Sequence, residues 1–466
     1  MEFEKIDCFI NKIKSEWKLP GIGVGIVSEK EVVYKKGFGY GSIKEKSIVT
    51  PNTLFCIGSI TKSYTSTGIA ILREKDLLQW KDPVKRYIPE FPFSNLTIKD
   101  LLSHKTGLPF YTENLLFTRT INTKEELLEI LGKLDANLLT ENYSYSNFMY
   151  VVLGYIIERI TGISWEEFTR KEILSPLKMW DTHFSFSGIK KTKNISSSYL
   201  IEDGILNKYP EELRNEYMFM NPAGGIISTV EDQCKWILFN LGAKGNIIKK
   251  DTLISLQKPV AVVRASSGKD ISYEAYCPGW KFLIYRNEPV LRHGGHVKGY
   301  SSEIVILPRR NFGAIILSNL GGTPAGQIIG MYLIDLLLGR EIVNWNKRFK
   351  EWKKKKDAEE KIKFGNRNKK MVKGITPLCD KKAFTGIYSN NIYGDIIISY
   401  KGNVLKIRIK RDWFNLQHLG QNLFEFYDKR NRRLEVEFCT DSNNKIIGLN
   451  LWFDLEIPVV NFKKGG

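Results

Sequence analysis

The segment Leu54-Phe55-Cys56-Ile57-Gly58-Ser59-Ile60-Thr61-Lys62 decides the fold expected for this chain. A short apolar run leads into Gly58 and Ser59, and a stretch typical of a helix continues through Arg73. We therefore expect Ser59 at the first turn of a buried helix. Side chains three positions apart share a helix face, so Lys62 returns beside the Ser59 hydroxyl. The N–H groups of a first helical turn lack partners within the helix, so the Ser59 amide can donate to an oxyanion.

The Ser-x-x-Lys spacing is a weak signal when it is taken alone. It recurs elsewhere in the chain, at Ser15, Ser175, Ser187, Ser255, Ser266 and Ser442. Alone it favours a plain helix N-cap serine at position 59. A serine hydroxyl needs an adjacent base, and a lysine is a base only when uncharged. Burial or a second cation must then lower the lysine pKa from its ordinary value of about 10.4.

A second motif, Tyr145-Ser146-Asn147, lies just before a strongly apolar helical stretch. On extended or loop backbone, side chains two positions apart project to the same side. The Tyr145 phenol can relay a proton to a leaving group, and the Asn147 amide can bond a substrate carbonyl and the lysine. A compatible alternative is that Ser146 or Asn147 caps the helix. Tyr388-Ser389-Asn390 repeats the spacing, so this motif is also weak alone.

A third motif, Arg292-His293-Gly294-Gly295-His296, precedes a predicted strand at 301–307. Adjacent glycines on an edge strand let the backbone of a ligand approach closely. The His296 N–H is then a candidate for the second oxyanion donor. The alternative is a glycine-rich turn with surface histidines, which we favour for the His296 side chain.

The three motifs occur in the order and spacing of one known constellation. Here the sequence resembles the serine β-lactamase and penicillin-binding-protein superfamily, and its class C and CubicO-like branch most closely. Further segments extend the resemblance over about residues 15–340: Asp82–Val84, Leu101–Pro109 and Asn221–Gly225.

The resemblance implies a role for each motif residue. The catalytic residues it implies are Ser59 as nucleophile, Lys62 as base and Tyr145 as its assistant. The implied oxyanion donors are the amides of Ser59 and His296. The implied substrate-binding residues are Asn147, His293, Gly294 and Gly295. It implies no cofactor and no metal.

The function implied is a serine hydrolase that forms an acyl-enzyme on Ser59 with a small-molecule or short-peptide substrate. His293 stands where penicillin-recognising members carry a lysine that pairs with the substrate carboxylate, and histidine is largely neutral near pH 7. We therefore rank a peptidase or amidase first, with D-amino-acid specificity as one option. A carboxylesterase comes second, and a β-lactamase or DD-carboxypeptidase third. A non-catalytic scaffold or penicillin-binding protein stays open as another class.

The first 345 residues predict an α+β fold. Gly21–Ser28 and Glu31–Phe38 form one expected strand pair, and Ser301–Leu307 and Phe312–Ser318 form another. A mostly helical inserted region lies between the pairs, and an apolar helix, Gly326–Leu338, follows. This order predicts one antiparallel sheet, assembled from both ends of the domain and flanked by helices.

Three parts are expected along the chain: the hydrolase domain at 1–345, a basic helical linker at 346–375 and a small antiparallel barrel at 376–466. In the last part Leu405, Ile407 and Ile409 alternate with charged residues, which is typical of half-buried strands. This region resembles the lipocalin-like domain often appended to the same branch. We regard it as a possible contact for homo-oligomers.

Charge and composition narrow the choice of partners, sites and cellular location for this protein. The net charge is +19, and residues 347–373 hold 13 Lys/Arg against 4 Asp/Glu. Because much of the excess positive charge is concentrated in residues 347–373, we interpret this stretch as a solvated helix and expect no nucleic-acid partner. The six cysteines form no CxxC pair. No signal peptide and no membrane span is apparent in the sequence, so a cytoplasmic location is expected.

Overall fold

The computed structural model divides the chain into two compact units. The first comprises residues 1–108, 122–128 and 136–349, and the second comprises 109–121, 129–135 and 350–466. The structure describes residues 2–108, 118, 121–134, 142–187, 189, 194–202, 204–209, 218–265, 269–297, 299–369, 380–428, 433–453 and 459–465.

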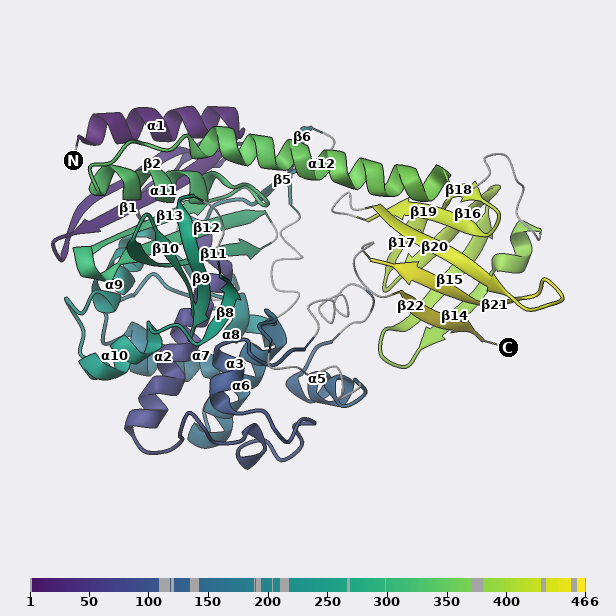
Figure 1. The fold of residues 1–466 in the computed structure, drawn as a ribbon, viewed down its shortest axis with the longest axis horizontal. Coiled ribbons are helices and arrows are strands. Elements are labelled where there is room, and N and C mark those ends of the chain that lie inside the picture. Colours follow the sequence, from purple (N-terminus) through teal and green to yellow (C-terminus); the bar gives the residue numbers. More distant parts are fainter. Residues whose placement is uncertain are drawn as a thin grey trace. The chain divides into compact units, whose positions relative to one another are not determined.

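A nine-stranded antiparallel sheet forms the centre of the first unit, in the order β3-β2-β1-β13-β12-β11-β10-β9-β8 (Figure 1). Its strands are β1 (Gly21–Ser28), β2 (Glu31–Ser42), β3 (Ser47–Ile48), β8 (Ala261–Arg264), β9 (Ile271–Cys277), β10 (Trp280–Tyr285), β11 (Glu288–Val297), β12 (Tyr300–Leu307) and β13 (Phe312–Ser318). Ile22 of β1 pairs with Ser318 of β13, so the two ends of the domain meet in one sheet, as predicted.

Tight turns set the register of the sheet. Glu29 and Lys30, between β1 and β2, both have positive φ angles, of 50° and 66°. Arg286 and Asn287, between β10 and β11, have φ angles of 48° and 67°. Two consecutive residues with positive φ form the type I′ turn, whose twist matches that of the flanking strands.

Helices cover both faces of this sheet. The described helices are α1 (Phe3–Glu16), α2 (Thr61–Glu74), α3 (Ile98–Leu102), α5 (Lys124–Leu131), α6 (Asn147–Thr161), α7 (Trp165–Thr169), α8 (Asn221–Gly224), α9 (Val230–Asn240), α10 (Lys250–Leu256) and α11 (Ala325–Leu337). Helix α11 packs on β12, β13 and α1, and they share one buried apolar core. Helix α9 packs on β1, β2 and β13, and Val230 and Cys234 approach Gly25 of β1.

The region between the two end pairs of strands is less helical than predicted. From Ala261 onward it forms β8, β9 and β10. In β9, Ile271, Tyr273 and Ala275 alternate with Ser272 and Glu274, and the buried Tyr276 then breaks the alternation. Two further short pairs lie in this region: β4 (Phe55–Cys56) with β7 (Ile227–Ser228), and β5 (Tyr199–Glu202) with β6 (Ile205–Lys208).

The C-terminal part is a nearly closed all-β barrel (Figure 1). Its strands are β14 (Gly386–Asn390), β15 (Gly394–Lys401), β16 (Val404–Ile409), β17 (Asp412–Asn415), β18 (Gln417–Gly420), β19 (Leu423–Tyr427), β20 (Arg433–Thr440), β21 (Ile446–Trp452) and β22 (Val460–Lys464). In β16, Leu405, Ile407 and Ile409 are buried, as their alternation predicts. The α+β fold with an appended all-β barrel is thus confirmed.

A single helix, α12 (Trp345–Lys369), follows the first unit. The division between the two units falls inside it, at Phe349 and Lys350. Residues 370–375 of the predicted linker and 376–379 of the predicted barrel lie outside the described residues. The domain limits at 345/346 and 375/376 therefore stay predictions. Within the described ranges, no helix combines the length and the low polarity needed to cross a bilayer.

Candidate active site

Ser59 lies in a single 3₁₀ turn, Gly58–Ile60, that runs directly into α2. Backbone contacts from distant segments hold this turn. The Ile57 N–H donates to the Ile226 oxygen at 3.0 Å, and the Ser302 hydroxyl of β12 donates to the Ile57 oxygen at 2.7 Å. Gly58 has a φ of +53°, which glycine adopts at little cost. The prediction that Ser59 begins a core helix is correct to within one turn.

The Lys62 side chain is fully buried, and its nitrogen joins three segments of the chain. Lys62 Nζ lies 3.1 Å from Ser59 Oγ, 2.6 Å from Asn147 Oδ1 and 2.6 Å from the Ala223 backbone oxygen. Both carbonyl oxygens only accept hydrogen bonds. A neutral amine has two N–H groups for these acceptors and a lone pair for the serine hydroxyl. The same three contacts also suit an ammonium with three N–H groups, so they accommodate both protonation states, of which a general base needs the neutral one.

Asn147 and Tyr145 come from the start of α6. Asn147 is the first residue of α6, and Ser146 occupies the N-cap position of this helix. This position of Ser146 agrees with one of the alternatives predicted from the sequence. The Ser146 side chain makes no capping bond. Lys62 Nζ lies 4.9 Å from the centre of the Tyr145 ring. The second Tyr-x-Asn has another role, because Asn390 Oδ1 accepts from the Ile392 and Tyr393 N–H groups in a loop of the barrel.

His293 is buried and held as a neutral ring. Its Nδ1 lies 2.8 Å from the Gly294 backbone oxygen, an acceptor, so Nδ1 carries the hydrogen. Its Nε2 then accepts from the Tyr276 hydroxyl at 3.0 Å. Burial, and after it the charges of Lys281 and Lys62, lower the pKa of His293 well below its ordinary range. The ring of Tyr145 lies 6.3 Å from that of His293, between centroids.

His104 is a site residue that the motifs did not single out. Its ring lies 4.3 Å from the Tyr145 ring and 4.5 Å from the Tyr276 ring, between centroids. His104 Nδ1 accepts from the Ser146 N–H at 3.2 Å, so the ring supports the backbone next to Tyr145. Burial and the charge of Lys62 lower its pKa well below the ordinary range. In the sequence, His104 lies in the segment 101–109 that resembles the family framework. That resemblance indicated no role for the His104 side chain.

Gly294, Gly295 and His296 lie on β11, against the Ser59 turn. A Cβ on Gly295 would be 1.9 Å from the Ile57 oxygen, so this position excludes a side chain. A Cβ on Gly58 would be 2.8 Å from the His296 nitrogen, which places that amide beside the turn. The His296 ring lies 3.4 Å from the Ser301 hydroxyl, and burial lowers its pKa. All eight predicted residues thus fall in one region.

β11 is an interior strand over half its length and an edge over the other half. It pairs with β10 only up to Arg292, opposite Lys281, but it pairs with β12 through Val297. In the part of the chain that the structure describes, the stretch 293–297 has one partner strand. The glycine motif therefore lies on an open strand edge, as predicted, whereas the start of β11 lies between two strands.

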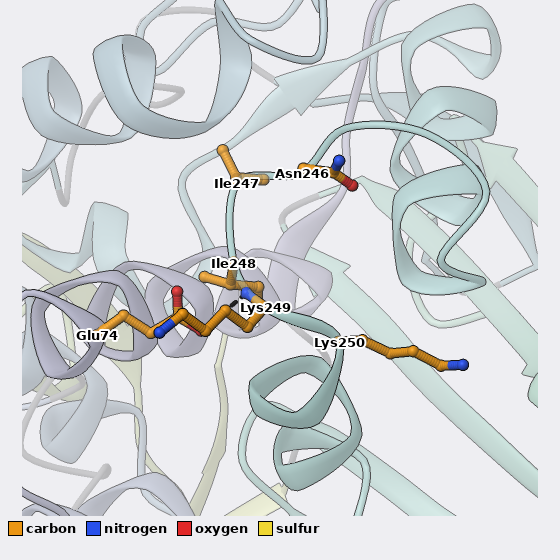
Figure 2. Close-up of a pocket in the computed structure, with 6 residues that line it drawn as sticks. All are labelled: Glu74, Asn246, Ile247, Ile248, Lys249 and Lys250. Atoms are coloured by element: carbon orange, nitrogen blue, oxygen red, sulfur yellow. Dashed lines mark hydrogen bonds between the residues drawn. The ribbon is translucent and has the colours of Figure 1, made fainter.

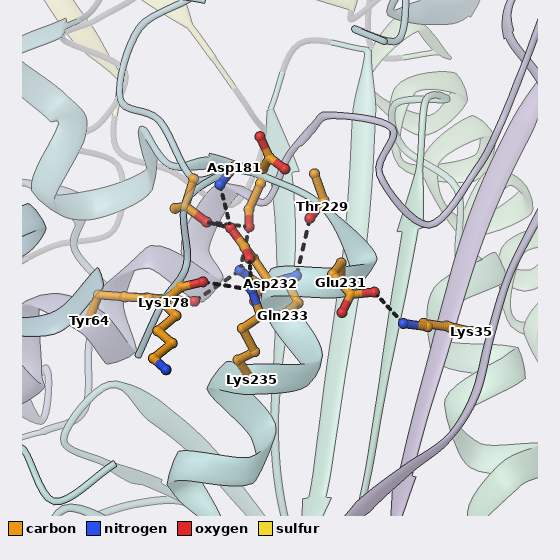
Figure 3. A network of polar contacts seen from close by, with 11 residues as sticks. Lys35, Tyr64, Lys178, Asp181, Thr229, Glu231, Asp232, Gln233 and Lys235 are labelled. Carbon is orange, nitrogen blue, oxygen red and sulfur yellow. Dashed lines mark hydrogen bonds and ion pairs between the residues drawn. The ribbon is translucent and has the colours of Figure 1, made fainter. Parts of the chain in front are cut away.

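A buried polar network supports α2 from behind. Trp236 of α9 stacks on Tyr64 at 3.8 Å and donates to the Ser63 hydroxyl at 3.1 Å. Gln233 donates to the Tyr64 hydroxyl at 2.9 Å (Figure 3). Because Tyr64 and Ser63 adjoin Lys62 in the sequence, these contacts keep the lysine in register.

A hollow of about 430 Å³ lies at the far end of α2 (Figure 2). There the Lys249 N–H donates to Glu74 Oε1 at 2.8 Å. None of the predicted site residues lines it. Within the described residues, no group of three or more His, Cys, Asp or Glu side chains is placed to hold a metal ion.

Comparison with known proteins identifies the family of this chain. The sequence model of the beta-lactamase family matches residues 9–338. The chain belongs to the beta-lactamase family. That match includes Ser59, Lys62, Tyr145, Asn147 and the glycine motif of β11.

Relatives of this beta-lactamase-family chain carry several names. The "Unguisins hydrolase ungD'" of Aspergillus campestris is 26% identical over 381 residues, which cover 78% of this chain and 70% of that protein. "Protein flp" of Staphylococcus aureus strain N315 is 28% identical over 335 residues, 70% of this chain and 65% of that protein.

Two solved structures share the fold. The octameric penicillin-binding protein homologue from Pyrococcus abyssi aligns with a TM-score of 0.67 and 25% identity, over 99% of this chain and 100% of the other. A class C beta-lactamase from Rhodobacter sphaeroides aligns with a TM-score of 0.60 and 20% identity, over 72% of this chain and 99% of the other.

Proposed function

We propose that this beta-lactamase-family protein is a serine hydrolase that forms an acyl-enzyme on Ser59. The observation that carries the proposal is the triple contact of Lys62 Nζ with Ser59, Asn147 and Ala223. This contact places the fully buried Lys62 amine beside the Ser59 hydroxyl. The amine N–H groups donate to the oxygens of Asn147 and Ala223, which are carbonyl oxygens and do not become protonated. That arrangement suits a base better than a structural ion pair.

In the proposed mechanism, Lys62 takes the Ser59 proton while Ser59 Oγ attacks a carbonyl carbon. The amides of Ser59 and His296 stabilise the oxyanion. The proton then passes through Lys62 or Tyr145 to the leaving nitrogen or oxygen, and the bond to the leaving group breaks. Water hydrolyses the acyl ester and restores the Ser59 hydroxyl. Asn147 and His293 orient the substrate, and Gly294 and Gly295 leave room for its backbone.

For the substrate we propose a peptide or amide first, with D-amino acids as one option, then an ester, then a β-lactam. Two observations support this order. The neutral His293 replaces a cation that penicillin-recognising members use for the substrate carboxylate. One relative is named a hydrolase of unguisins rather than a beta-lactamase.

Labelling with a fluorophosphonate probe tests the nucleophile. We expect labelling of the wild type and none of Ser59→Ala. Ser255→Ala is the matched control, because it lies in another Ser-x-x-Lys and its hydroxyl donates only to the Thr252 oxygen. Labelling that persists in Ser59→Ala would refute the assignment. Ser59 acylation by a β-lactam without turnover of any ester, amide or peptide would favour the penicillin-binding alternative.

We also propose that copies associate through the C-terminal barrel. The full-length alignment with an octameric homologue supports association between copies. Light scattering of the intact protein tests it, and a monomeric mass at micromolar concentration would overturn it.

A further inference from the structure

His104 is hydrogen-bonded to the backbone on both sides of Tyr145. The Ser144 N–H donates to the His104 backbone oxygen at 2.8 Å, and the Ser146 N–H donates to His104 Nδ1 at 3.2 Å. Asn147, the first residue of α6, follows directly. One residue just after α3 therefore holds the backbone from which the Tyr145 phenol and the Asn147 amide project.

The His104 ring also contacts the two tyrosine rings that lie next to the Lys62 amine. Its centroid lies 4.3 Å from that of the Tyr145 ring and 5.1 Å from that of the Tyr150 ring. Lys62 Nζ lies 4.9 Å and 5.4 Å from the centres of the same two rings. His104 and Lys62 share both tyrosine neighbours, so a shift of the histidine ring would change the surroundings of the base.

The backbone of His104 has an uncommon conformation. Its φ angle is +55°, in the left-handed region, which side chains other than those of Asn, Asp and His adopt rarely. Non-glycine residues keep such a conformation only where the surrounding structure fixes it, and they cluster at active sites. The φ angle is therefore a second observation, independent of the ring contacts, that singles out position 104.

The hydrogen bonds of the His104 ring define it as an acceptor. Nδ1 accepts from the Ser146 N–H, so the hydrogen of the neutral ring is on Nε2. Within the described residues, Nε2 has no hydrogen-bond partner. A second proton on Nδ1 would oppose the Ser146 N–H and add a positive charge near Lys62. The neutral ring with Nδ1 as acceptor is thus the form that this packing accommodates.

We propose that His104 is a positioning residue, which as a neutral hydrogen-bond acceptor keeps the Tyr145 phenol and the Asn147 amide in place beside the base. This inference rests on the proposed function and goes beyond it, because no step of that mechanism uses His104. The histidine acts through the backbone of residues 144–147 and the Tyr145 ring, and it takes no proton. The alternative is a core residue that only fills space, and substitutions separate the two roles.

Three substitutions of His104 test the acceptor role through the rate of fluorophosphonate labelling. His104→Asn offers Oδ1 as an acceptor and tolerates the positive φ angle, so it should retain most of the wild-type rate. His104→Phe keeps a ring and His104→Gly tolerates the φ angle, but neither has a side-chain acceptor. We expect both to be labelled about 10- to 100-fold more slowly, because a displacement of about 1 Å can cost about 100-fold. Ser146→Ala, which leaves the backbone N–H in place, is the control and should match the wild type.

Other patterns of labelling would overturn the acceptor role. A fast His104→Phe variant would mean that packing of a ring suffices, and a fast His104→Gly variant would mean that only the backbone conformation matters. A slow His104→Asn variant would also contradict the proposal. Thermal melting shows which variants are folded at the assay temperature. If His104→Phe does not fold, the comparison of His104→Gly with His104→Asn still decides.

A double substitution shows whether His104 acts through Tyr145. Tyr145→Phe removes only the phenol oxygen, so His104→Gly should slow labelling less in this background than in the wild type. Equal factors in the two backgrounds are what a purely structural role predicts, and they would overturn the route through Tyr145. A wild type that is not labelled at Ser59 would overturn the proposed function. A labelled wild type with equally fast His104 variants would overturn this inference alone.

Discussion

Lys62 Nζ lies 2.6 Å from the backbone oxygen of Ala223, although 161 residues separate the two positions. A backbone acceptor holds the amine regardless of the side chain at position 223. Through this contact, the segment 221–225 helps to orient the proposed base. Ala223 itself is buried.

Removing the base should abolish activation of Ser59. We expect Lys62→Ala to slow fluorophosphonate labelling by about 10²- to 10⁴-fold, the usual effect of general-base loss. Lys62→Arg should be as slow, because a guanidinium stays protonated. Lys75→Arg, on the surface and paired with Glu172, is the control. Labelling rates decide the question, and a fast Lys62→Arg variant would contradict the role of a neutral amine.

Gly295 should tolerate no side chain. In Gly295→Ala the new Cβ would lie 1.9 Å from the Ile57 oxygen and 2.3 Å from Ser302 Oγ, so β11 must move away from the Ser59 turn. We expect a lower melting temperature and at least a tenfold loss of labelling rate, because the His296 amide moves with the strand. Gly41→Ala, whose nearest contact would be an ordinary 3.4 Å, should behave like the wild type.

Folding stability should fall when the solution is acidified below about pH 6.5. Burial lowers the pKa of both His104 and His293 in the folded protein, so the unfolded chain binds more protons below the ordinary pKa. Stability is then present above that pKa and declines at lower pH, by about 1.4 kcal/mol per pH unit for each histidine. Urea unfolding at pH 7.5 and 5.5 measures this. In His293→Asn, the unfolding free energy should depend less steeply on pH. An unchanged pH dependence in both His293→Asn and His104→Asn would exclude the two histidines as its cause.

Replacing Asp232 should destabilise the fold much more than replacing its neighbour Glu231, although both acidic residues lie on α9 (Figure 3). Asp232 is buried and accepts from the Asp181 N–H and the Thr182 hydroxyl at 2.8 and 2.9 Å. Asp232→Ala leaves both donors without this acceptor, which costs about 1–3 kcal/mol. Glu231→Ala removes only an exposed pair with Lys35 and should cost under about 1 kcal/mol. Equal unfolding free energies for the two variants would contradict this reading of the network.

The sequence alone was sufficient for features that depend on local periodicity and short spacing. The strand pairs at both ends, the helix after Ser59 and the alternation in β16 follow from patterns of two or three residues, which backbone geometry converts directly into shared faces. The order of the three motifs was enough to select the eight candidate residues.

Only the tertiary structure decided what surrounds those residues. The contact of Lys62 with Ala223 and the ring of His104 against Tyr145 join segments that are far apart in the chain. No local pattern encodes such contacts, because they depend on how strands and helices pack. The environment that keeps His293 neutral comes from this packing, since burial is a property of the folded chain.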